Sequence, residues 1–181
     1  TALLLAACAD QEEAAPSREA SLVKEAAIAI PDEYAARVTE EILLAGGNAV
    51  DAAVAAGFAL AVTYLDAGNI GGGGFMLIHM EGEPYFLDYR ETAPSAAHKD
   101  MFLNEQGDVI EYSTLIGARA AGVPGTVAGF WAAHQRFGKL PWEQVLQPAI
   151  KLAKEGFVPP QILADDVQSR FDWFGSYTNF I

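Results

Sequence analysis

Hydrophobic and polar positions follow the periods of several helices and one β-hairpin along this chain. Val23–Ile30 is a short apolar segment, as in a strand, and a helix is predicted to start at Pro31, because proline is tolerated in a first helical turn. One apolar stripe recurs with helical spacing at Ala35, Val38, Ile42 and Ala45. Gly46 and Gly47 end this helix, which we expect to pack on one face.

The next apolar stretch differs because it is hydrophobic on all sides. Asn48 is a favourable N-cap, and Asp51 stands three residues later, where an acidic side chain can reach back to the start of a helix. Residues 48–64 are mostly apolar and rich in alanine, so neighbouring backbones can approach closely. We predict that this segment is a buried core helix.

Four consecutive glycines, Gly71 to Gly74, precede two apolar segments of strand length. The first runs from Phe75 to Met80 and the second from Tyr85 to Glu91, with the turn residues 82–84 between them. This arrangement predicts a β-hairpin.

The second half of the chain contains helical patterns separated by loops. They occupy residues 99–103, 126–137, 140–155 and 161–174. Thr126 is expected to cap the second of these helices, and Pro148 is expected to kink the third. Together with the hairpin, they indicate an α+β fold with helices layered against a largely antiparallel sheet.

Composition and charge narrow the function classes. The 181 residues are 51% hydrophobic, which excludes a disordered chain and suffices for one domain with a sizeable core. Eleven Lys and Arg stand against 24 Asp and Glu, giving a net charge of −13. Nucleic-acid binding draws on basic side chains that displace counterions from phosphates, so the charge argues against a nucleic-acid partner.

The small number of histidines and cysteines argues against a metal site, and no other cofactor is expected. His79, His98 and His134 are scattered, and no two of them have the i, i+4 spacing of a helical metal motif. The single cysteine, Cys8, cannot form an internal disulfide. The longest apolar run, 52–62, is too short to cross a membrane.

Residues 1–8 look like the end of an export signal. Their apolar stretch is followed by small residues, and Leu5-Ala6-Ala7-Cys8 resembles the lipobox in which a bacterial cysteine becomes lipidated. We therefore expect a truncated lipoprotein signal peptide at 1–8, a polar tether at 9–21 and a folded part at 22–181. This predicts lipid anchoring in the periplasm or cell envelope, whereas the alternative is an ordinary free or buried thiol at Cys8.

Two features could carry chemistry. The glycine run at 71–74 fits neither a dinucleotide loop nor a P-loop, so it either forms a tight connection beneath another element or lines a substrate pocket. Arg90 ends an apolar strand, where a partly buried charge needs a carboxylate partner. Its planar guanidinium suits a bidentate grip on a substrate carboxylate, but these residues alone favour a structural ion pair with Asp88, Glu91 or a distant acid. No nucleophile motif such as GxSxG is present.

Three long segments nevertheless carry a family resemblance. They read GGNAVDAAVAAGFALAVTYLDAGNIGGGGFMLI, LDYRETAPSAAHKDMFL and GVPGTVAGFWAAHQRFGKLPWEQVLQPAIKLAKEGF. In order and spacing, from about Ala27 to about Asp166, they resemble the N-terminal part of the large subunit of bacterial γ-glutamyltransferases, the glutathione hydrolases of the Ntn-hydrolase superfamily. The resemblance implies an αββα sandwich, with two antiparallel sheets between helix layers, of which this chain is a part.

The resemblance also implies a mechanism. Family members are precursors that cleave themselves, and the Thr at the start of the small subunit attacks the γ-glutamyl amide of glutathione with its own amine as base. The acyl-enzyme passes the γ-glutamyl group to water, an amino acid or a peptide. In the motif Asp88-Tyr89-Arg90-Glu91-Thr92-Ala93-Pro94, Arg90 inherits the binding of the substrate α-carboxylate. The catalytic Thr is expected downstream, so no catalytic residue is assigned in this chain, which is expected to be inactive by itself.

Other functions share the same pattern. Cephalosporin (glutaryl) acylases and enzymes of poly-γ-glutamate capsule keep an arginine for a carboxylate, and a non-catalytic envelope lipoprotein is a third alternative. The expected partners are glutathione and other γ-glutamyl compounds, amino acid or peptide acceptors, the small subunit of the same precursor, and the membrane through the lipid anchor.

Overall fold

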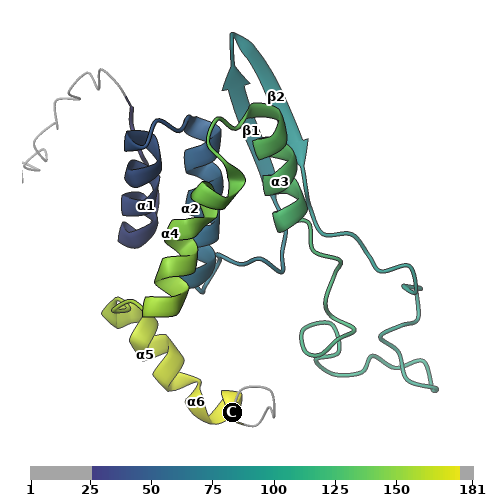
Figure 1. Cartoon of the computed structure of the whole chain (residues 1–181). Coiled ribbons are helices and arrows are strands. Elements are labelled where there is room, and N and C mark those ends of the chain that lie inside the picture. Colours follow the sequence, from purple (N-terminus) through teal and green to yellow (C-terminus); the bar gives the residue numbers. More distant parts are fainter. Residues whose placement is uncertain (1–25, 176–181) are drawn as a thin grey trace, which may run out of the picture.

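The computed structural model describes residues 26–175, which form six helices and one β-hairpin (Figure 1). The elements are α1 (Glu33–Leu44), α2 (Ala49–Thr63), β1 (Phe75–Met80), β2 (Glu83–Asp88), α3 (Thr126–Phe137), α4 (Trp142–Glu155), α5 (Gln161–Ser169) and α6 (Phe171–Phe174). Cys8, its lipobox and the tether lie outside the described residues.

Helix α1 has the predicted apolar stripe, and a side chain caps its N-terminus. Asp32 is the N-cap, and its Oδ1 accepts a hydrogen bond from the Ala35 amide at 2.7 Å. The buried positions include Ala35, Val38 and Ile42, whereas Ala45 is exposed. The strand expected at 23–30 is wrong for residues 26–30, which have no regular structure, because no strand among the described residues lies beside them to complete a ladder.

Helix α2 confirms the predicted capping box and the predicted burial. The Asn48 side chain accepts hydrogen bonds from the amides of Val50 and Asp51, while Asp51 Oδ2 accepts from the Asn48 amide at 2.9 Å. Helix α2 contacts α1, α3 and α4, so it is central to the helical layer (Figure 1). The buried core includes Val38, Ile42, Val54, Ala55, Ala59, Ile78, Phe130 and Val145.

The hairpin is confirmed, but its turn lies earlier than predicted. Met80 pairs with Glu83, which leaves Glu81 and Gly82 as the two loop residues, at φ 53° and 85°. Positive φ at both positions is typical of a type I′ turn, whose twist matches that of paired strands. Pro84 lies in β2 opposite His79, which is tolerated because each strand of a two-stranded sheet is an edge strand.

The later helices need three corrections. Residues 99–102 form turns instead of a helix, and Leu103 forms an isolated β-bridge with Val109. Helix α3 has the predicted bounds, but Gly125 is its N-cap, and Thr126 is the first helical residue without a side-chain cap. The segment 161–174 is divided at Arg170 into α5 and α6. Pro148 lies inside α4, and the kink expected there stays a prediction.

Two parts of the fold position the site. Helices α1, α2 and α4 form one layer, and α3 packs beside α2 and contacts β2 (Figure 1). Residues 89–125 form a long excursion without helices between β2 and α3. Within residues 26–175, no helix has the length and apolar character needed to cross a membrane.

Candidate functional site

Arg90 lies just beyond β2, after Tyr89, at a place where hydrogen bonds hold the backbone on both sides. Tyr89 and Gly74 exchange two backbone hydrogen bonds, with N–O distances of 3.0 and 3.4 Å. Beyond Arg90, Thr92 and Val123 exchange another two, at 3.3 and 2.8 Å. The segment that carries Arg90 therefore has a defined path although it lies outside the regular strands.

The Arg90 side chain pairs with its neighbour Glu91. Arg90 Nε lies 3.2 Å from Glu91 Oε2, while Asp88 Oδ1 accepts a hydrogen bond from the Arg90 backbone amide at 3.0 Å. The guanidinium carbon is 5.8 Å from the ring centroid of Phe75. The predicted pair with Glu91 is thus present, but the partly buried charge is not, because the Arg90 side chain is 62% exposed.

The ion pair engages only one edge of the guanidinium. Among residues 26–175, no side chain or carbonyl forms a hydrogen bond or an ion pair with the two terminal nitrogens of Arg90. These nitrogens, Nη1 and Nη2, present a fork that fits the two oxygens of a carboxylate. The structural ion pair and the carboxylate grip are therefore compatible with each other.

The groups next to Arg90 have shifted pKa values. The pKa of Glu91 lies below its usual range, first because its own backbone amide donates to the carboxylate. Desolvation opposes this shift, and Arg90 and the Gly73 amide add to it. Burial raises the pKa of Tyr89, so this side chain stays a neutral phenol. The Glu91 carboxylate is consequently ionised at neutral pH.

The glycine run lies against the Arg90 backbone. A Cβ at Gly73 would lie 2.5 Å from the Tyr89 carbonyl oxygen and 2.7 Å from the Glu91 amide nitrogen. Since any side chain there would collide with backbone, only glycine fits without a shift of the chain. The glycine run therefore fits the first of its two interpretations, a tight connection packed against another segment, here the backbone of residues 89–91.

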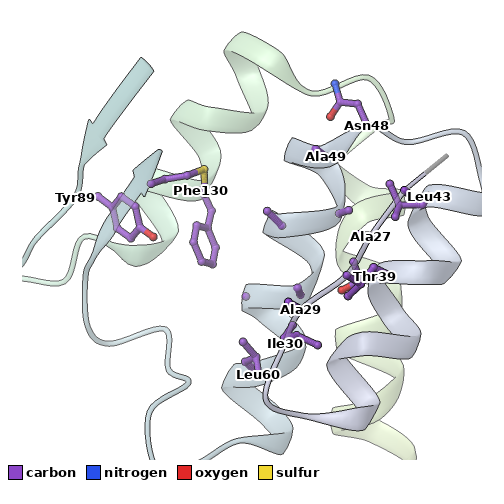
Figure 2. A pocket seen from close by; sticks show the side chains of 17 residues that line it. Ala27, Ala29, Ile30, Thr39, Leu43, Asn48, Ala49, Leu60, Tyr89 and Phe130 are labelled. Atoms are coloured by element: carbon purple, nitrogen blue, oxygen red, sulfur yellow. The ribbon is translucent and has the colours of Figure 1, made fainter. Parts of the chain in front are cut away.

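A cavity of about 750 Å³ lies behind Tyr89 (Figure 2). Tyr89 and Phe130 form one side of it, and residues 26–30 with parts of α1 and α2 form the other. Its lining is mostly alanine and other apolar side chains, and Arg90 is not part of it. None of the described residues that line the cavity is charged, so Arg90 is the better candidate for binding a charged ligand.

One buried polar cluster could not be found from the sequence. Asp51 Oδ1 lies 3.6 Å from His134 Nε2, and the two side chains are 0% and 7% exposed. Asp51 also accepts hydrogen bonds from the backbone amides of Lys139 and Leu140. The predicted capping box assigns Asp51 to the start of α2, but nothing in the sequence indicates its contact with Lys139, which is 88 positions away.

The histidines are otherwise separate, as predicted. His134 is a core residue, and its Nε2 lies 2.8 Å from the Leu140 carbonyl oxygen, whereas His79 and His98 are exposed. A carbonyl can only accept, so Nε2 carries the proton. Within the described part of the chain, no group of three or more His, Cys, Asp or Glu side chains could hold a metal ion.

The sequence and the fold both match known proteins. The chain belongs to the gamma-glutamyltranspeptidase family, whose model matches residues 35–180. A glutathione hydrolase proenzyme from Pseudomonas aeruginosa is 57% identical over 167 residues, which are 92% of this chain and 30% of that protein.

Solved structures agree with this assignment. The gamma-glutamyltranspeptidase from Pseudomonas nitroreducens, complexed with L-DON, is 58% identical, with a TM-score of 0.81 over 87% of this chain and 47% of that chain. The enzyme from Helicobacter pylori is 43% identical, with a TM-score of 0.83 over 88% of this chain and 46% of that chain. These matches confirm the predicted α+β fold of Ntn hydrolases. This chain covers less than half of each of the two solved chains.

The alternative enzymes are not better supported. A cephalosporin acylase from Bacillus halodurans is similar at only 28% identity, with a TM-score of 0.67. The higher identity and the closer superposition both favour the transpeptidase family.

Proposed function

We propose that the protein containing this chain is a γ-glutamyltransferase that hydrolyses glutathione and related γ-glutamyl amides or transfers their γ-glutamyl group to amino acids and peptides. The observation that carries the proposal is the 57% identity to a glutathione hydrolase proenzyme, which extends over 92% of the chain. The word proenzyme in that name supports a precursor that is divided into two subunits. The reacting threonine belongs to the second subunit.

In this proposal, Arg90 binds the α-carboxylate of the γ-glutamyl group. Glu91 holds Nε, which fixes the plane of the guanidinium, and the two terminal nitrogens remain for two parallel charge-assisted hydrogen bonds. Such binding orients the γ-carbonyl carbon for nucleophilic attack, because the substrate is held at its other end. The chain thus contributes substrate positioning, and the downstream subunit contributes the covalent chemistry.

The direct test is the substitution Arg90→Ala in the full-length protein. We expect KM for γ-glutamyl-p-nitroanilide to rise by roughly 30-fold or more, equivalent to about 2 to 4 kcal/mol, with a smaller effect on kcat. Arg37→Ala is the matched control, because Arg37 is an exposed arginine paired with Glu33 four residues away. An unchanged KM in Arg90→Ala would contradict the assigned role, and a wild-type protein without γ-glutamyl hydrolysis would contradict the proposed activity.

We further propose that Cys8 is lipidated and that residues 9–21 tether the enzyme to a membrane of the cell envelope. The support is the lipobox-like sequence before the single cysteine. In cell fractionation, Cys8→Ser is expected to move the protein from the membrane to the soluble envelope fraction, whereas Ser17→Ala in the tether is expected to leave it membrane-bound. A Cys8→Ser protein that stays with the membrane would overturn this proposal.

A further inference from the structure

Two glycines from distant parts of the chain enclose the backbone of Arg90. A Cβ at Gly73 would lie 2.5 Å from the Tyr89 carbonyl oxygen and 2.9 Å from the Arg90 carbonyl carbon. A Cβ at Gly125 would collide with the same Tyr89 carbonyl oxygen and lie 3.2 Å from the Arg90 oxygen. Neither glycine has a left-handed φ, so it is the lack of space that excludes a side chain at these positions.

Hydrogen bonds join Gly125 to Gly72, the residue before Gly73. The Gly72 carbonyl oxygen accepts from the Gly125 amide at 2.8 Å and from the Thr126 amide at 3.0 Å. These hydrogen bonds tie the glycine run to the start of α3, where the first amides lack partners inside the helix. We call Gly72, Gly73 and Gly125 the glycine clasp, because Gly73 and Gly125 lie against the Tyr89–Arg90 backbone and the Gly72 carbonyl links the glycine run to Gly125.

We propose that Gly73 is a positioning residue for Arg90 and that the glycine clasp sets the location of the guanidinium relative to the substrate carboxylate. This inference rests on the proposed function, since it requires that Arg90 binds substrate. A methyl group at Gly73 can be accommodated only if the Tyr89–Glu91 backbone moves by about half an ångström or more. A bidentate guanidinium–carboxylate contact tolerates little displacement, and misplacement by about 1 Å can cost a factor of about 100 in an enzyme.

The glycine run itself supplies a graded series of alanine substitutions. At Gly71 nothing lies within 4 Å of the added Cβ, so Gly71→Ala is the matched control. At Gly74 the added Cβ would lie 3.2 Å from the Tyr89 ring and its hydroxyl, which requires only a small adjustment. At Gly73 the Cβ meets the backbone itself, which cannot rotate away as a side chain can.

The experiment measures kcat and KM for γ-glutamyl-p-nitroanilide with the full-length enzyme and its variants. We expect Gly71→Ala to leave KM unchanged, Gly74→Ala to raise it about 2- to 5-fold and Gly73→Ala to raise it about 10-fold or more, with kcat changed less than 3-fold. Equal KM values for Gly71→Ala and Gly73→Ala would overturn the proposal. If Gly73→Ala gives no folded protein, the decision falls to Gly74→Ala. The proposal is then overturned if Gly74→Ala and Gly71→Ala have equal KM values.

A double substitution separates positioning from a general structural defect. If Gly73 acts through Arg90, then Gly73→Ala in the Arg90→Ala background is expected to raise KM less than 2-fold. The same factor in both backgrounds would show a merely structural role and overturn the proposal. If Arg90→Ala itself leaves KM unchanged, the proposed function of Arg90 fails. If Arg90→Ala raises KM and Gly73→Ala does not, only the positioning role fails.

Discussion

The carboxylate of Asp51 and the imidazole of His134 face each other in the protein interior, with 3.6 Å between Oδ1 and Nε2. Asp51 is fully buried and also accepts the backbone amides of Asn48, Lys139 and Leu140. A buried carboxylate is tolerated only where several donors replace the water it has lost. Asp51 therefore joins the start of α2 to the connection between α3 and α4.

Replacing Asp51 by Asn is expected to destabilise the fold. The NH₂ of asparagine would replace one carboxylate oxygen and would face buried backbone amides that can only donate, while the remaining oxygen would carry no full negative charge. The loss is expected to be about 3 kcal/mol, seen as a melting midpoint several degrees lower in thermal unfolding of the full-length protein. Glu33→Gln, at an exposed ion pair with Arg37, serves as control and is expected to change stability by less than about 0.5 kcal/mol.

Thr63→Val tests the hydrogen bond that links the end of α2 to the start of α1. The buried Thr63 hydroxyl donates to Asp32 Oδ1 at 2.7 Å, so the last residue of α2 supports the N-cap of α1. Valine has nearly the same shape but no donor, and we expect a loss of about 1 to 2 kcal/mol in thermal or urea unfolding. Thr114→Val, at an exposed position, is expected to have no comparable effect, and equal results for both variants would contradict this interpretation.

Gly57→Ala is expected to destabilise helix α2 although alanine is the better helix former. An added Cβ would collide with the ring of Phe130 from α3. Alanine gains about 1 kcal/mol in intrinsic helix propensity, but forced overpacking costs about 1 to 3 kcal/mol. The double variant with Phe130→Leu is expected to recover part of the loss, and a melting midpoint raised by Gly57→Ala alone would show that the contact is not tight.

The pH dependence of Glu91 follows from its lowered pKa. Because the folded-state pKa lies below the unfolded value, the ionised carboxylate contributes stability that is present above the unfolded pKa and lost as the pH falls through the folded one. A ¹³C NMR titration, assigned with Glu91→Gln, is expected to give a midpoint below the ordinary value of 4.5. Arg90→Ala is expected to restore only part of the difference, because the first cause is the backbone amide of Glu91. A midpoint at or above 4.5 would contradict the hydrogen bonds that stabilise the ionised Glu91 carboxylate.

The parts predicted well from the sequence depend on neighbours a few residues apart. The capping box of Asn48 and Asp51 forms within a single turn, and Gly46 and Gly138 lie just after the ends of α1 and α3. The family motif around Arg90 is likewise one contiguous stretch of sequence, and the substrate-binding role that it implies for Arg90 stays a prediction. Such features are readable because the interacting groups are adjacent in the chain.

The errors have equally specific causes. Pro84 looked like a turn residue, but the hairpin turns at Glu81 and Gly82, where a glutamate adopts positive φ to match the strand twist. Residues 26–30 are apolar enough for a strand but have no strand beside them among the described residues. Strand formation depends on a partner, and the local sequence does not contain it.

The sequence by itself determined most of the helices, the hairpin and the family, and it predicted a substrate-binding role for Arg90, because periodicity, caps and a contiguous motif are local properties. Only the tertiary structure decided that Gly125 meets Tyr89, that Asp51 holds the amides of Lys139 and Leu140, and that Glu91 leaves one edge of Arg90 open. These contacts join residues that are far apart in the chain or depend on side-chain direction. Close packing and buried hydrogen bonds stabilise these contacts, and both arise only when the folded chain brings the residues together.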